Sequence, residues 1–286
     1  MAGKIRFLHI PKTAGSTFDD CLFLLHLKPY LLRRQFVFSG NIRRDRERFA
    51  AMPARSRQRL ALCTGHAPLH TGCLELDQMP TVTLLRDPVE RVKSFCQHIS
   101  EGKSPQIYRR EGGQPFDLDA LLASGRIQLN NFQSRMILGG DAYQLPRGDV
   151  AGLAEQAVAR LAEGLAGFGL TEELDCSLLL FRRTLGWQRW PVYRSRNRKD
   201  TAALLQFERR HIERIRELNS LDEAVYGAAR ELFEQRLALH CPDIEAELAQ
   251  FRLQQSAPQP LFAVLDAARG LSRLKRRGGG GRAGGV

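Results

Sequence analysis

The sequence is poor in the features that mark secreted or membrane-spanning chains. Its 286 residues contain six cysteines, whose scattered positions are typical of a reduced interior rather than a disulfide framework. No uninterrupted apolar run reaches the length of a membrane span. The first expected strand follows Met1 almost at once, without the charged, apolar and small-residue segments of a secretory signal. These absences predict a soluble, cytoplasmic protein.

Negative charge is also scarce. Lys and Arg number 43 against 31 Asp and Glu, a formal net charge of +12, which favours a nucleotide, a polyanionic glycan, nucleic acid or a membrane surface as partner. We expect one α/β domain over residues 1–255, and a short helix with a disordered basic Gly-rich tail over 256–286. The tail offers at most weak membrane-surface contact. The arginines that crowd between Arg33 and Arg59 are typical of a solvated helix face.

A strand, a loop and a helix near the amino terminus predict an anion site. The apolar run Ile5–Ile10 is typical of a buried strand that Pro11 ends, and a helix is expected over Phe18–Leu27. Backbone N–H groups and the helix dipole point into such a turn, and hydroxyls and a lysine add to it. A polar turn without a ligand is the alternative. The residues predicted to hold a phosphate are Lys12, Thr13, Ala14, Gly15, Ser16 and Thr17.

This lysine loop, residues 12–17, differs from the nucleoside-triphosphate loop. That motif has two glycines and places its lysine beside the helix. Here Lys12 comes first, Gly15 is the single glycine, and no later expected strand ends in an obvious magnesium-binding aspartate. A phosphotransferase that uses ATP or GTP is therefore kept as an alternative.

A second expected strand, Leu60–Thr64, ends just before His66. Ligands bind beyond the carboxyl ends of strands in open α/β sheets, so His66 lies where chemistry would occur. It is predicted either as a general base for an acceptor hydroxyl or as a loop histidine bonded to the backbone. Zinc is a further alternative, because Cys63, His66, His70 and Cys73 have a spacing that can surround a tetrahedral ion, although Cys63 falls on the strand.

The clearest strand, Thr81–Leu85, is followed by Arg86. Asp87 as N-cap and Pro88 in the first turn predict a helix that continues past Ser94. A guanidinium at the strand end and a hydroxyl nearly two turns into the helix can share a second phosphate. A salt bridge between Arg86 and a neighbouring aspartate is the structural alternative.

Together, the lysine loop and the Arg86-Asp87-Pro88 turn resemble the sulfotransferases that use 3′-phosphoadenosine 5′-phosphosulfate (PAPS), particularly the carbohydrate and heparan sulfate 2-O- and 6-O-sulfotransferases. The stretch Gly167–Glu172 matches a Gly-Leu-Thr-Glu stretch of that family, and the resemblance covers most of residues 4–240. It implies a parallel sheet flanked by helices, in a sulfotransferase fold similar to P-loop nucleoside-triphosphate hydrolases and nucleotide kinases.

The resemblance also implies roles for single residues. The lysine loop would hold the 5′-phosphosulfate, and Arg86 with Ser94 the 3′-phosphate. His66 matches the catalytic histidine, with His70 as the alternative, and Lys12 would stabilise the leaving group. The remaining matches are His98 at the acceptor, and Tyr193 and Arg198 in a nucleotide-gripping loop.

The implied reaction is sulfuryl transfer from PAPS to a hydroxyl of a carbohydrate or glycan, which can be anionic. Positioning and electrostatics account for such a reaction, so no metal is required. Because the implied acceptor is a glycan, no nucleic acid partner is expected. A non-catalytic binder of anionic glycan is the second alternative. Residues 130–136 resemble a stretch of the 6-O-type enzymes, and their amides and arginine either contact a ligand or brace helices.

Overall fold

Five parallel strands form one sheet in the order β2-β3-β1-β4-β5. The computed structural model describes residues 3–27, 32, 34–103, 116–139, 150–194, 204–255, 262, 263 and 266. The predicted α/β class with a parallel sheet is confirmed. The strands are β1 (Ile5–Leu8), β2 (Gln35–Phe38), β3 (Leu62–Gly65), β4 (Thr81–Leu85) and β5 (Gly167–Leu170).

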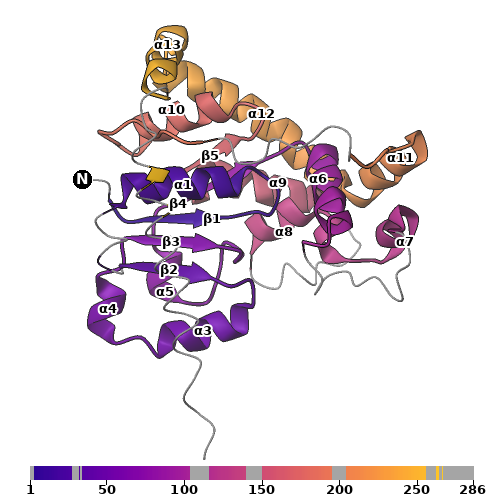
Figure 1. Cartoon of the computed structure of the whole chain (residues 1–286), viewed down its shortest axis with the longest axis horizontal. Coiled ribbons are helices and arrows are strands. Elements are labelled where there is room, and N and C mark those ends of the chain that lie inside the picture. Colours follow the sequence, from indigo (N-terminus) through magenta and orange to yellow (C-terminus); the bar gives the residue numbers. More distant parts are fainter. Residues whose placement is uncertain are drawn as a thin grey trace, which may run out of the picture.

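Helices cover both faces of this sheet (Figure 1). Helices α1, α10 and α13 pack on one face against Ile5, Phe7 and Val82, and α8, α9 and α12 pack on the other against Leu8, Leu85 and Phe168. Helices α6, α7 and α11 share a separate apolar cluster, to the right in Figure 1.

The helical bounds are α1 (Gly15–Leu25), α3 (Ile42–Ala50), α4 (Ala54–Gln58), α5 (Leu74–Asp77), α6 (Pro88–Ser100), α7 (Leu118–Ala123), η1 (Ile127–Leu129), α8 (Phe132–Leu138), α9 (Val150–Ala159), the π-helical turn η3 (Arg160–Gly164), α10 (Leu174–Thr184), α11 (Arg209–Leu218), α12 (Ser220–His240) and α13 (Ile244–Gln255).

Strand β2 is absent from the elements that the sequence predicts. Its four residues alternate in burial, with Phe36 and Phe38 turned into a core shared with Phe49 and Leu76, and Val37 exposed. So short an alternation at a sheet edge gives little periodic signal among the arginines that follow it. The prediction of a helix face for Arg33–Arg59 is therefore wrong for this first part.

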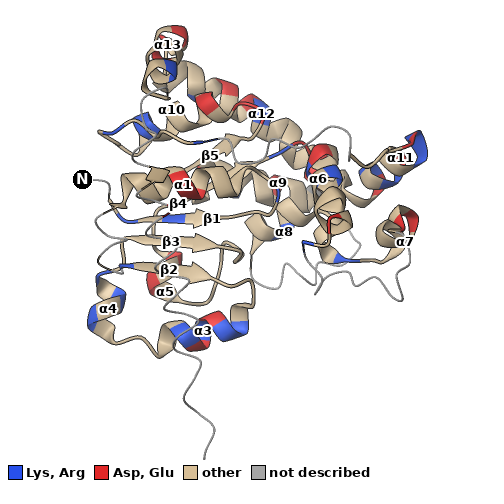
Figure 2. Ribbon diagram, viewed as in Figure 1, with Lys and Arg blue, Asp and Glu red and all other residues tan. Residues whose placement is uncertain are grey.

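The rest of that segment agrees with the prediction. Figure 2 shows the Lys and Arg colour on α3 and α4, and the arginines there are mostly exposed. Phe49 points inward from α3 and packs with β2. The tail expected over 256–286 lies outside the described residues, apart from Phe262, Ala263 and Asp266.

His26, just beyond α1, is a histidine that the fold buries without a partner. Its side chain is 1% exposed, and neither ring nitrogen has a hydrogen-bond partner within the described part of the chain. Burial disfavours the charged imidazolium and lowers the pKa of His26 to about 4.

We expect His26 to make the protein less stable in acid. The unfolded chain binds this proton below pH 6.5, whereas the folded chain binds it only below about 4. The contribution to stability is therefore fully present above pH 6.5 and is lost as the pH falls toward 4. One pKa unit corresponds to about 1.4 kcal/mol, so the loss is about 3 kcal/mol.

Urea unfolding of the wild type and of His26→Leu across this pH range measures the effect. The variant should lack this part of the acid dependence, and identical pH profiles for the two proteins would contradict the prediction.

Candidate active site

The parallel sheet brings the predicted site residues to one edge. Strands β1, β3, β4 and β5 all run in the same direction, and Leu8 lies beside Gly65 and Thr83 in the pairing register. The lysine loop follows β1, His66 follows β3, Arg86 follows β4, and Glu172 follows β5 shortly after its last residue. This carboxyl edge is where ligands bind in open α/β sheets.

The lysine loop turns sharply into α1. Lys12 and Ala14 have φ values of 74° and 58°, left-handed conformations that are uncommon for residues with a side chain. Thr13 is buried, and its hydroxyl donates to the carbonyl of Ile10 at 2.9 Å. Helix α1 begins at Gly15, earlier than the predicted Phe18. The first N–H groups of a helix have no acceptor within the helix, so the start of α1 has the backbone donors that the predicted anion site requires.

Arg86 reaches this turn from the end of β4. Its Nη1 donates to the Lys12 carbonyl at 3.3 Å, and its Nε lies 3.9 Å from Glu172 Oε1. The salt bridge considered from the sequence is therefore present, but its partner is a glutamate from the end of β5. Asp87 instead caps the start of α6 by accepting from the Glu90 N–H at 2.9 Å, as predicted.

Gln133 holds the backbone of Arg86. Its Oε1 accepts from the Arg86 N–H at 2.9 Å, and its Nε2 donates to the Arg86 carbonyl at 2.8 Å. The side chain is 2% exposed, and Asp222 accepts from the Gln133 N–H. The amide therefore acts like a further strand residue where β4 ends, and it fixes the direction in which Arg86 leaves the sheet.

Within residues 130–136, the other amides brace helices. Asn131 Oδ1 accepts from the N–H groups of Leu221 and Asp222 at the start of α12, while Asp222 accepts from the start of α8. Helices α8 and α12 thus cap each other. This confirms the bracing interpretation for Asn131.

Ser94 and His98 lie one turn apart on α6, and both side chains are partly buried. The hydroxyl of Ser94 has no hydrogen-bond partner in the part of the chain that the structure describes. Arg91 of the same helix is fully buried, lies over the Phe132 ring at 5.8 Å and donates to the Gln128 carbonyl. Helix α6 is thereby fixed against α8.

His66 lies at the site with one ring nitrogen already bonded. Its Nδ1 is 2.8 Å from the His9 carbonyl oxygen, and because a carbonyl only accepts, Nδ1 carries the proton and Nε2 keeps its lone pair. Although the side chain reaches the surface, loss of water around the ring lowers the pKa of His66, and the nearby His9 lowers it further. His66 can therefore be hydrogen-bonded to the backbone through Nδ1 and still be available as a general base through Nε2.

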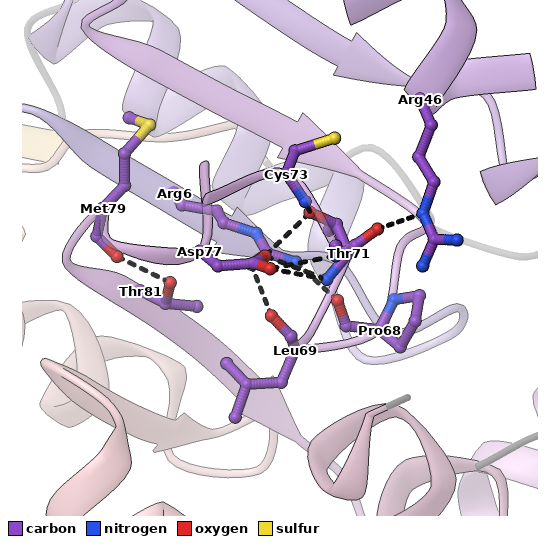
Figure 3. A network of polar contacts seen from close by, with 10 residues as sticks. Arg6, Arg46, Pro68, Leu69, Thr71, Cys73, Asp77, Met79 and Thr81 are labelled. Atoms are coloured by element: carbon purple, nitrogen blue, oxygen red, sulfur yellow. Dashed lines mark hydrogen bonds and ion pairs between the residues drawn. The ribbon is translucent and has the colours of Figure 1, made fainter. Parts of the chain in front are cut away.

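The loop that carries His66 and His70 is attached to β1 through a buried arginine (Figure 3). Arg6, 1% exposed, donates to the carbonyls of Pro68 and Leu69 and pairs with Asp77 at 3.2 Å. Asp77 in turn accepts from the backbone and the hydroxyl of Thr71. The loop is therefore fixed from inside, and the His70 side chain is exposed.

The zinc alternative finds no support. Within the described residues, no group of three or more His, Cys, Asp and Glu side chains could hold a metal ion. Cys63 is fully buried in an apolar cluster with Phe36 and Leu60, and burial raises the pKa of its thiol to about 12. All six cysteines are free thiols.

Tyr193 is held by a carboxylate of α10 and an aromatic ring of α13. Its hydroxyl donates to Asp175 at 2.7 Å, and its ring packs near Phe251 of α13. Burial, and then the bond to Asp175, raise the pKa of this tyrosine well above its ordinary value. Arg198 lies outside the described residues.

Sequence reasoning gave no role at the site to Glu172, His9 or Asp19, and it named Gln133 only as part of residues 130–136. Glu172 accepts from the Asp87 N–H and from the Tyr226 hydroxyl, so it joins β5 to α6 and α12. Gln133 and Glu172 fall inside stretches that carry the family resemblance, which was the available signal for these two. Their partners are distant in sequence, and no local pattern identifies them.

Curated relatives extend this picture. The α/β fold, with a loop-to-helix turn, an arginine and a histidine at the carboxyl edge of a parallel sheet, places polar groups where ligands bind in open α/β proteins. Heparan-sulfate 6-O-sulfotransferase 1 of Homo sapiens is 30% identical over 180 residues, which are 54% of this chain and 43% of the relative. Heparan-sulfate 6-O-sulfotransferase 2 of Danio rerio is 26% identical over 200 residues, 61% of this chain and 42% of the relative. No family model matches.

The predicted resemblance to the carbohydrate sulfotransferases is therefore confirmed, and the parallel sheet flanked by helices is consistent with their fold. The chain spans less than half the length of the curated relatives that it matches.

The prediction of a cytoplasmic protein is wrong. The heparan-sulfate 6-O-sulfotransferases that the chain resembles are Golgi-resident membrane proteins, and this contradicts the prediction. The chain spans less than half the length of these relatives, so the point at which the given sequence begins carries no information about location. Among the described helices, none is both long and apolar enough to cross a membrane.

Replacing Gln133 by leucine should weaken the binding of adenosine 3′,5′-bisphosphate by up to about 30-fold, because the Arg86 backbone loses two hydrogen bonds of about 1 kcal/mol each. Isothermal calorimetry measures this. Gln97→Leu is the matched control, because Gln97 is also buried and also accepts from a backbone N–H, that of Leu205, away from Arg86. Wild-type affinity in both variants would contradict the prediction.

Proposed function

We propose that the protein is a sulfotransferase that moves the sulfuryl group of PAPS to a hydroxyl of a carbohydrate acceptor. The observation that carries this proposal is the hydrogen bond from Arg86 to the Lys12 carbonyl, which joins the ends of two neighbouring strands, β1 and β4. This hydrogen bond places the Arg86 guanidinium, which can bind a phosphate through two N–H groups, beside the proposed anion-binding turn. Two neighbouring anion sites suit a donor with two separate phosphates. The reaction class follows from the names of the curated relatives.

For the donor, we assign the 5′-phosphosulfate to the lysine loop, with Lys12, Ser16, Thr17 and the N–H groups at the start of α1 as contacts. The left-handed Lys12 and Ala14 support this assignment, because a strained turn of this kind directs backbone N–H groups toward an anion. Arg86 and Ser94 are assigned to the 3′-phosphate. Arg198 remains a candidate for the nucleotide.

In the proposed reaction, His66 Nε2 takes the proton of the acceptor hydroxyl while the acceptor oxygen attacks sulfur in line. The bond between sulfur and the bridging oxygen breaks, and its electron pair goes to the phosphate of adenosine 3′,5′-bisphosphate. Lys12 and the backbone N–H groups stabilise the charge that grows on that oxygen. His66 suits the role of base because its lowered pKa keeps it neutral near pH 7.

The acceptor is proposed to be a glycan, in line with the heparan sulfate in the relatives' names. His98 is the candidate contact for its sugar. The exposed arginines on α3 and α4 suit an acceptor that carries negative charge (Figure 2).

Calorimetric titration without magnesium tests the donor assignment. We expect tight binding of adenosine 3′,5′-bisphosphate and much weaker binding of ADP, because ADP lacks the 3′-phosphate. Equal binding of the two nucleotides, or binding only with magnesium, would instead support a phosphotransferase.

Two substitutions test the mechanism by steady-state kinetics. Lys12→Ala should lower kcat about 100-fold or more, because the charge it neutralises appears mainly in the transition state. His66→Ala should lower kcat between about 100- and 10,000-fold while leaving the affinity for the bisphosphate unchanged. His70→Ala is the matched control, and loss of turnover in that variant alone would transfer the role of base to His70.

A further inference from the structure

Two side chains with no assigned role, His9 and Asp19, lie in a row that leads to the His66 ring. The His9 carbonyl accepts the His66 Nδ1–H bond, and the two imidazole rings lie 4.5 Å apart between centroids. The other side of the His9 ring meets α1, where Nδ1 lies 3.2 Å from Asp19 Oδ2. The order in space is therefore Asp19, His9, His66, although the three residues come from three different segments.

Packing against Phe7 and Gly15 fixes the position of the His9 ring. It stacks on Phe7 with centroids 5.1 Å apart, and it fills the space beside Gly15, where a Cβ atom would come within 2.0 Å of His9 Nε2. The side chain is 12% exposed. Gly15 is thus needed to admit the imidazole beneath the first turn of α1, and the ring lies directly under the proposed phosphosulfate turn.

Asp19 connects three parts of the site. One of its oxygens accepts from the Thr64 hydroxyl at the end of β3, and the other faces His9. Burial by itself would raise the pKa of Asp19, but the hydrogen bonds from His9 and Thr64 and the charge of His9 outweigh it and lower that pKa. The group therefore stays a carboxylate at neutral pH, so a negative charge lies behind His9.

We propose that Asp19 and His9 are positioning residues for the general base, and that they hold His66 in the form whose Nε2 faces the acceptor. This proposal rests on the sulfotransferase function proposed above. The Asp19 carboxylate anchors the His9 side chain, the anchored residue presents its carbonyl to His66 Nδ1, and that bond leaves Nε2 unprotonated.

His9 and Asp19 also influence how readily His66 binds the acceptor proton during the reaction. When His66 takes the acceptor proton, it becomes an imidazolium beside His9, and the carboxylate of Asp19 opposes the accumulated positive charge. The charged groups whose fields reach His66 are His9, from the segment after β1, and Asp19, from α1. The segment after β2 approaches His66 at Gly40, where a Cβ atom would lie 3.7 Å from the His66 Cβ. His9 lowers the pKa of His66 and Asp19 raises it.

His9→Asn tests this role, since asparagine keeps an N–H donor near the Nδ1 position but carries no charge. We expect kcat to fall up to about 100-fold through misplacement of His66, with a smaller change in the affinity for adenosine 3′,5′-bisphosphate. The acid limb of the kcat/KM profile should move to higher pH, because the charge that lowers the pKa of His66 is gone. Asp19→Asn should also lower kcat.

Asp20→Asn is the matched control. Asp20 is the next residue of α1 and is fully buried, and its carboxylate lies 3.8 Å from Arg194 rather than beside His9. We expect it to alter stability but neither kcat nor the pH profile. Unchanged kcat and pH profile in both His9→Asn and Asp19→Asn would overturn the proposal.

A readout without turnover separates this proposal from the proposed function. Nitrogen NMR of histidine-labelled protein, with the His66 signal assigned by its loss in His66→Gln, should show the Nδ1–H form in the wild type. Its titration should move to higher pH in His9→Asn. An Nε2–H form in the wild type overturns the positioning proposal even if the protein transfers sulfuryl groups, and the expected NMR result with no transfer rejects the function alone.

Discussion

The parallel pairing of β1 with β3 on one side and β4 on the other is the constraint on which the candidate site depends. Pairing in register places Leu8 beside Gly65 and Thr83, so the chain leaves the sheet at neighbouring points with the lysine loop, His66 and Arg86. Side chains from both faces of the sheet hold this pairing, with Phe7 and Val82 in one cluster and Leu8 and Leu85 in the other. The hydrophobic core therefore sets the distances between the lysine loop, His66 and Arg86.

Buried polar groups fix the loops that the core alone cannot fix. Arg6, Gln133 and Asp19 each bond to a segment far away in the sequence: the loop beyond His66, the backbone of Arg86, and the ends of β1 and β3. Burying a charge or an amide is costly unless its hydrogen bonds are made. These hydrogen bonds form in only one arrangement of the loops. Any other arrangement of the loops would leave buried polar groups unpaired, so the site is held in a single geometry.

Acidic side chains limit the positive charge at the same edge. Glu172 faces Arg86 while accepting from the N–H of Asp87, and Asp19 faces His9. Without Glu172, the positive charges of Lys12 and Arg86 would repel each other in the absence of an anion. The proposed donor, with its two phosphates, would meet cations that are already oriented, and orientation before binding reduces the entropy lost when the complex forms.

The sequence by itself determined the local units: a strand that Pro11 ends, a turn with Lys12 and Gly15, and a helix that Asp87 caps. Each depends on neighbours in the chain, so residue order, periodicity and capping chemistry identify it. The family resemblance extended this to His66 and Arg86. Only the tertiary structure decided that Gln133 binds the Arg86 backbone and that Asp175 accepts from Tyr193. The same holds for the edge strand Gln35–Phe38 and for the row Asp19, His9, His66. These contacts join segments that no short pattern relates, because their partners meet only once the sheet has formed and its helices have packed.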